Sequence, residues 1–182
     1  MSNNSSSTWA GPTHQALIDA GISIVGYVPD GGLTDLIVAL DADDRMKTVR
    51  LTTEEEGVAL VAGAWLGGAR AALLMQSSGV GNCTNMLSLL ETCAVPALLL
   101  VTMRGQDGES NPWQLPMGQA AGQTMELMGV DVRSVGSADA VAAEVTRACH
   151  DAFEADGGAT AVMVEQKVIG VKSFSGDNEG EG

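Results

Sequence analysis

The chain has 182 residues and a formal net charge of -14, from 23 acidic and 9 basic residues. This length fits one domain that can bury a core without disulfides or a metal, and the lack of a basic stripe argues against a nucleic-acid partner. No apolar run is long enough to cross a bilayer, and MSNNSSSTWAGPTH has neither the basic nor the apolar region of a secretion signal. We therefore expect a cytoplasmic protein with no membrane partner.

The predicted elements alternate between strands and helices along the chain. We expect strands at 24–28, 48–52, 71–75, 97–101, 131–135 and 160–164, and helices at 12–21, 33–40, 53–66, 83–93, 117–128 and 137–153. Hydrophobic residues make up 45% of the chain but aromatic residues only 3%, which is typical of parallel strands covered by helices. The pattern predicts an α/β fold, a three-layer α/β/α domain with a mainly parallel, doubly wound sheet.

The ends of the chain differ in composition from its middle. Residues 1–10 are rich in Ser and Asn, and residues 173–182 are acidic and rich in Gly. We expect a mobile N-terminus over 1–10, one domain over 11–172, and an acidic disordered tail over 173–182.

Four segments follow predicted strands, namely VPDGG, TTEEE, QSSGVGN and MRGQDGESN. Because loops at the carboxyl ends of parallel strands form the ligand crevice of doubly wound folds, we expect the functional residues there. Cys83, Cys93 and Cys149 are widely spaced and lack a nearby His pair, so neither a disulfide framework nor a metal site is predicted within the chain.

The helix predicted over 53–66 has three acidic residues, Glu54, Glu55 and Glu56, in its first turn. Its apolar stripe is spaced at i, i+3, i+4 and i+7 and comprises Val58, Val61, Ala62 and Trp65. Thr53 and Glu56 have the spacing of a capping box, which leaves Glu55 without a capping task. On periodicity alone, these carboxylates are more simply explained as solvated charges that complement the helix dipole.

Three other segments have both a structural and a functional interpretation. The glycines of Gly79-Val80-Gly81 could serve only a strand-to-helix connector, or could let a flat ring approach the backbone. Asp30 could cap the following helix. Arg104 could form a surface ion pair with Asp107 or Glu109, or could offer its planar guanidinium to an anionic substrate.

Taken together, Val28-Pro29-Asp30, Glu55-Glu56-Gly57, Gly79-Val80-Gly81 and the segment 103–120 resemble the pyrimidine-binding (PYR) domain of thiamine diphosphate enzymes. Within that family the likeness is greatest to alpha subunits of sulfopyruvate decarboxylase. The resemblance implies that Glu55 hydrogen-bonds the N1′ nitrogen of the cofactor's aminopyrimidine. It further implies cofactor contacts from Pro29, Gly79, Val80, Gly81 and Asn82, and substrate contacts from Asp30, Ser78, Asn82, Arg104 and Gln114. The family usually has Ser after the Asp, whereas this chain has Gly31.

Family members also use a diphosphate-binding domain whose Gly-Asp-Gly and Asn residues hold a divalent metal, and this motif pair is absent from the sequence. The resemblance therefore implies thiamine diphosphate as cofactor, with Mg²⁺ bound by a beta subunit, in a hetero-oligomer built from dimers. It implies a small anionic 2-oxo acid substrate, 3-sulfopyruvate, with phosphonopyruvate or another 2-oxo acid as alternatives. A non-catalytic structural or regulatory PYR partner is a second possibility. A nucleotide- or flavin-binding domain ranks last, because neither GxGxxG nor GxxxxGK[ST] occurs where it would be needed.

Overall fold

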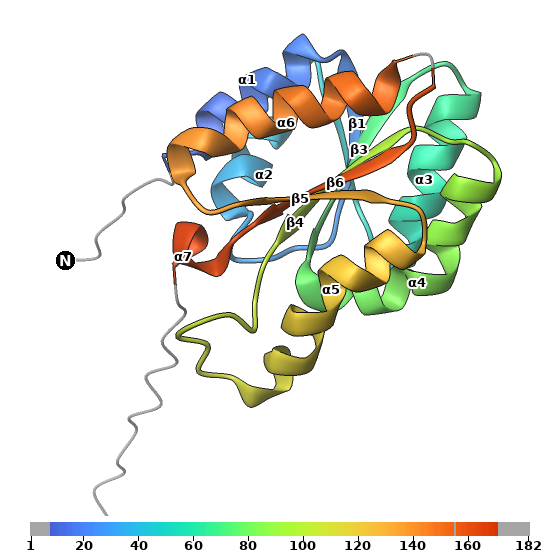
Figure 1. The fold of residues 1–182 in the computed structure, drawn as a ribbon. Coiled ribbons are helices and arrows are strands. Elements are labelled where there is room, and N and C mark those ends of the chain that lie inside the picture. The colour runs from blue at the N-terminus through green and yellow to red at the C-terminus, as the bar shows by residue number, and fades with distance from the viewer. Residues whose placement is uncertain (1–7, 155, 171–182) are drawn as a thin grey trace, which may run out of the picture.

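The computed structural model describes residues 8–154 and 156–170. Six strands form one sheet in the order β2-β1-β3-β4-β6-β5, and every neighbouring pair is parallel. Helices cover both faces of this sheet (Figure 1). The predicted three-layer α/β/α fold with a doubly wound sheet is confirmed.

The regular elements occur in the following chain order. They are α1 (Ala10–Asp19), β1 (Ile22–Tyr27), α2 (Thr34–Asp41), β2 (Lys47–Arg50), α3 (Glu54–Leu66), β3 (Arg70–Gln76), α4 (Ser77–Thr92), β4 (Ala97–Thr102), the 3-10 turn η1 (Pro112–Gln114), α5 (Leu115–Leu127), β5 (Asp131–Val135), α6 (Ala138–Phe153), β6 (Ala159–Val164) and α7 (Gln166–Ile169).

Two apolar cores lie on opposite faces of the sheet. Helices α1, α2 and α6 pack on one face, whereas α3, α4 and α5 pack on the other (Figure 1). Leu74 and Leu98 point into the first core, and Leu73 and Leu99 into the second. This alternation follows from the two-residue period of a strand, and it explains why the central strands are continuous aliphatic runs.

All six predicted strands are present within one or two residues of their expected positions, whereas the first helix begins at Ala10, within the segment predicted to be mobile. Trp9 is 1% exposed and Ala10 is 4% exposed, because both belong to the apolar core on the α1, α2 and α6 face of the sheet. Residues 1–7 of the predicted mobile segment and the predicted tail (173–182) lie outside the described residues, and Thr8 lies in an exposed turn. The short helix α7, which follows β6, was not predicted.

Within the described part of the chain, no helix combines the length and apolar character needed to span a membrane.

Candidate active site

The candidate site lies at the edge of the sheet where β1, β3 and β4 end. Here the loop after β1 meets the first turns of α3 and α4 and the segment that follows β4. These are the segments that the sequence placed at the ligand crevice.

Glu54, the first residue of α3, is only 9% exposed. Its Oε2 accepts a 2.8 Å hydrogen bond from Nδ2 of Asn82. A Cβ atom at position 79 would lie 2.5 Å from both the carboxyl carbon and Oε1 of Glu54. A glycine at this position therefore leaves room for the carboxylate where it lies. The first turns of α3 and α4 are therefore fitted to each other around one buried acid.

Glu55, the predicted catalytic residue, is exposed in the single chain, and its role stays a prediction, whereas Glu54 is the acid that the structure buries. The buried side of α3 includes Glu54, Val58 and Val61, spaced as one helical stripe, and the next residue is turned about 100° away from it. The predicted capping box between Thr53 and Glu56 is not formed. Oε2 of Glu56 accepts a hydrogen bond from the Thr52 amide at 2.9 Å, while the N-cap side chain makes no cap bond.

The segment QSSGVGN is not the turn that the sequence predicted, since α4 already begins at Ser77. Val80 is fully buried, whereas Gly81 and Asn82 are exposed on the outer side of the helix. The amides of Gly81 and Asn82 are thus inside the helix, and the amides of the first turn that lack i−4 partners are those of residues 77–79. Oγ of Ser77 accepts a hydrogen bond from the Arg104 amide at 3.0 Å, which ties the segment after β4 to this turn.

Cys83 lies one helical turn beyond Gly79 and is fully buried. Burial, followed by the nearby charges of Glu54 and Glu55, raises the pKa of its thiol to about 12. A thiol that stays protonated at neutral pH is a poor nucleophile. Cys83 therefore serves packing at this site.

Asp30 joins the ends of three strands. Its Oδ1 accepts a hydrogen bond from Nε2 of Gln76 at 2.7 Å, and its Oδ2 accepts bonds of 3.0 Å each from Oγ1 of Thr102 and the Gly32 amide. Oγ of Ser78 donates to Oε1 of Gln76 at 2.8 Å. The predicted substrate contacts Asp30 and Ser78 are thus committed to a network within the chain. Asp30 does not cap α2, which makes no side-chain cap bond.

Arg104 is also committed, which corrects the prediction of an anion-binding guanidinium. Its Nε and Nη2 each donate a 2.6 Å hydrogen bond to the carboxylate of Glu109, and the two side chains are 6% and 0% exposed. Glu109 further accepts bonds from the amides of Gly105 and Asn111 and from Nε2 of Gln166. These donors, led by the guanidinium, hold the pKa of Glu109 well below its ordinary value. The alternative of an ion pair with Glu109 is the correct one, but the pair is buried.

The same segment is attached to the C-terminal part of the domain. The Gln106 amide donates to Oε1 of Gln166 at 3.0 Å, and the Gln166 amide donates to Oε1 of Gln106 at 2.7 Å. Gly105 has a φ of 73° and packs its Cα against the backbone of α5. Oε1 of Gln114 is buried and has no hydrogen-bond partner among the described residues. Gln114, a predicted substrate contact, lies on η1, next to the segment 103–111 that follows β4, which we call the fastened segment.

Two cavities open at this edge of the sheet. One of about 510 Å³ is lined by the segment after β4, the start of α5 and Lys167. The other, of about 400 Å³, is lined by Pro29, Asp30 and Arg50. Pro29, a predicted cofactor contact, is exposed at its mouth.

No family model matches the chain. It is 36% identical over 118 residues to sulfopyruvate decarboxylase subunit alpha of Methanococcus maripaludis, a match that covers 64% of this chain and 71% of the relative. The subunit of the same name from Methanothermobacter thermautotrophicus is 38% identical over 117 residues, covering 64% of this chain and 71% of the relative.

A third relative is a longer protein. Phosphonopyruvate decarboxylase of Streptomyces viridochromogenes is 38% identical over 117 residues, 63% of this chain but only 30% of that protein. Among solved structures, the thiamine diphosphate-dependent 4-hydroxybenzoylformate decarboxylase of Rhodococcus jostii RHA1 superposes with a TM-score of 0.71 and 16% identity, over 90% of this chain and 31% of the other. This last likeness shows the fold.

Proposed function

Because the chain belongs to the family of sulfopyruvate decarboxylase alpha subunits, we propose that it is the alpha subunit of a two-subunit, thiamine diphosphate-dependent decarboxylase. The proposed reaction converts 3-sulfopyruvate to sulfoacetaldehyde and CO₂. The observation that carries the proposal is the buried carboxylate of Glu54, held between Gly79 and Asn82 at the edge of a fold shared with a thiamine diphosphate enzyme.

The residues at this site fit an aminopyrimidine ring. Such a ring needs a carboxylate that faces one ring nitrogen, and a neighbouring wall without side chains. Glu54 provides the carboxylate, and no donor within the described part of the chain is bonded to its Oε1. Gly79 leaves room for that carboxylate, because a Cβ there would lie 2.5 Å from Oε1 of Glu54.

We assign to Glu54 the role that the resemblance gave to Glu55. When bound, the cofactor supplies the carbanion that attacks the keto carbon and the electron sink for decarboxylation. Asn82 holds Oε2 of Glu54 and so fixes the direction of Oε1, which would share a proton with the ring nitrogen of the bound cofactor. Because the carboxylate is largely buried, its interaction with the ring is weakly screened by water.

We further propose that a separate beta subunit supplies the diphosphate and Mg²⁺ contacts, so that each active site lies between two chains. The relatives are named as alpha subunits, which supports a partner. The hetero-oligomer is proposed to be built from dimers, and the cytoplasmic location stays a prediction. Since Arg104 is bound by Glu109, we expect the acidic end of the substrate to meet the first-turn amides of α4 and side chains of the partner.

Phosphonopyruvate is the second candidate substrate, because the phosphonopyruvate decarboxylase relative matches at the same level of identity. A sulfonate and a phosphonate both require hydrogen-bond donors and positive charge, so the described residues do not separate them.

Reconstitution tests the proposal. The chain is mixed with the candidate beta subunit from its source organism, thiamine diphosphate and Mg²⁺, and CO₂ release is measured from sulfopyruvate and from phosphonopyruvate. We expect faster release from sulfopyruvate, and none when either chain is omitted. Faster release from phosphonopyruvate would reassign the substrate. A complex that binds the cofactor but decarboxylates neither acid would favour a non-catalytic partner.

A further inference from the structure

The large hydrophobic side chains that the described residues leave exposed are unevenly distributed. Of seven, only Val38 lies on α2, and six lie on or just before α3, α4 and α5, namely Trp65, Leu66, Leu89, Trp113, Leu115 and Leu127. Leu66, Trp113 and Leu127 are 85%, 85% and 79% exposed. Scattered apolar residues are normal on a protein surface, but their concentration on one layer indicates a surface that another molecule covers.

Charge is distributed in the opposite way. Helices α3, α4 and α5 carry five charged residues, all acidic and all near helix ends, namely Glu54, Glu55, Glu56, Glu91 and Glu126. Between them the exposed positions include Ala59, Gly81, Asn85 and Ser88, which are small and uncharged. Depletion of charge at the centre of a surface is the compositional mark of an interface core.

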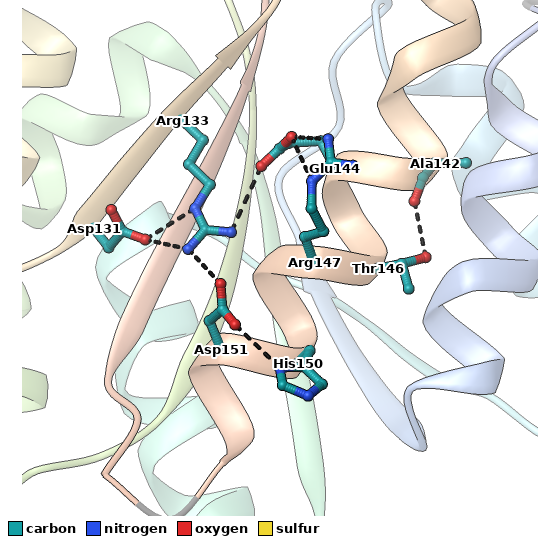
Figure 2. A network of polar contacts seen from close by, with 8 residues as sticks. All are labelled: Asp131, Arg133, Ala142, Glu144, Thr146, Arg147, His150 and Asp151. Carbon is teal, nitrogen blue, oxygen red and sulfur yellow. Dashed lines mark hydrogen bonds and ion pairs between the residues drawn. The ribbon is translucent and has the colours of Figure 1, made fainter.

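The helices on the other face have the character of a surface that faces water. On α6 and β5, the guanidinium of Arg133 is bound by Asp131 at 2.5 Å and by Asp151 at 2.8 Å, and Glu144 pairs with both Arg133 and Arg147 (Figure 2). No ion pair of the described residues involves a residue of α3, α4 or α5. The contrast shows that the uncharged surface is a property of one helical layer.

We infer that the outer surface of α3, α4 and α5, here called the docking face, is covered by a chain of different sequence. The matching surface of that chain is apolar at its centre and basic at its margins. A second copy of this chain is the wrong occupant, because a two-fold contact would bring eight exposed carboxylates, four from each copy, around one interface with no Lys or Arg from these helices to pair with them. Lys or Arg side chains at the margins of a different partner chain would pair with these exposed carboxylates.

The docking face is continuous with the candidate active site. Asn82, whose amide holds Glu54, and Gly81 are exposed on the first turns of α4, and Asn85 and Ser88 follow on the same side of that helix. A chain that covers this row therefore also closes over the buried carboxylate. The identification of this chain as the beta subunit rests on the proposed function, whereas the position of the docking face does not.

The test compares two small-to-Arg substitutions at exposed helical positions. Ser88→Arg lies at the centre of the docking face, and Ala143→Arg lies on the outer side of α6. Each variant is coproduced with the candidate beta subunit, its fold is checked by thermal unfolding, and its affinity for that subunit is measured by sedimentation. We expect Ser88→Arg to weaken binding by about 10-fold or more, because it places a bulky unpaired charge in a dry contact, and Ala143→Arg to bind as the unmodified chain does.

A second variant covers the case in which Ser88→Arg fails to fold. Leu66→Ser changes a side chain that is 85% exposed, so it should leave the fold intact and still weaken binding. Unchanged affinity in the folded variants would overturn the inference. A homodimer of the chain alone that Leu66→Ser or Ser88→Arg dissociates would overturn the choice of occupant. Activity is measured separately, so loss of binding in a complex that never decarboxylates would refute the proposed function and leave the docking face standing.

Discussion

Replacing Glu54 by Gln changes the proposed proton relay while preserving its shape. Asn82 donates to one carboxylate oxygen at 2.8 Å, so the new amide must turn its own oxygen toward Asn82. Its NH₂ group then occupies the position of Oε1, and an acceptor facing the cofactor becomes a donor. Because the hydrogen bond and the packing against Gly79 are kept, we expect little change in stability. Loss of a positioned acid-base group lowers turnover by about 10² to 10⁴-fold, or about 3 to 5 kcal/mol in the barrier.

Glu55→Gln is the matched control for this substitution. It makes the same chemical change one residue away, on an exposed side chain. Both variants are assembled with the beta subunit, thiamine diphosphate and Mg²⁺, and single-turnover CO₂ release is measured at saturating cofactor. We expect Glu55→Gln to stay within a few-fold of the unmodified complex. Equal losses in the two variants, or full activity of Glu54→Gln, would refute the assignment of the relay to the buried acid.

Gly79, Glu109 and the cysteines offer further tests of the structure. Gly79→Ala should reduce cofactor-dependent activity, because its Cβ would lie 2.5 Å from the buried carboxylate, whereas Gly11→Ala, which meets nothing within 4 Å, should be silent in the same assay. Glu109→Gln should lower the free energy of unfolding in urea by about 3 to 5 kcal/mol, since it leaves a buried guanidinium without its counter-charge. The stability that Glu109 contributes is present above its ordinary pKa of 4.5 and should be lost as pH falls below that value, because the folded state lowers its pKa. Iodoacetamide at about pH 8 should label exposed Cys93 in the folded chain and spare Cys83, whose thiol pKa is raised to about 12; equal labelling would contradict the burial.

The sheet could be predicted because its strands are encoded locally. Runs such as 71–75 and 97–101 are continuous aliphatic segments, and a strand covered on both faces needs nothing else. The edge of the sheet that carries the site could also be predicted, since parallel topology gathers the carboxyl ends of strands together.

The identity of the buried acid was missed although the sequence contained the evidence for it. Glu54 lies four residues before Val58, so it continues the apolar stripe back to the start of the helix, but three adjacent acids suggested a solvated first turn. The same stripe was extended too far in the other direction, because Trp65 is 40% exposed.

Two other features depend on contacts between distant segments. Glycines at 79 and 81 suggested a turn, yet packing against α3 makes this segment helical, and tertiary contacts of this kind override local propensity. Arg104 and Glu109 are five residues apart in an irregular segment, where spacing does not determine which side chains meet. Their burial depends on Gln166, which lies 57 residues beyond Glu109.

The fastened segment after β4 has a consequence for how the subunits meet. Its buried ion pair and its two reciprocal glutamine contacts form when the chain folds, so its conformational entropy is already lost before any encounter with another subunit. Association then requires little ordering of this wall. The rate of assembly should depend on diffusion and on long-range attraction between this acidic chain and the basic margins of the proposed partner surface, and it should fall as ionic strength rises.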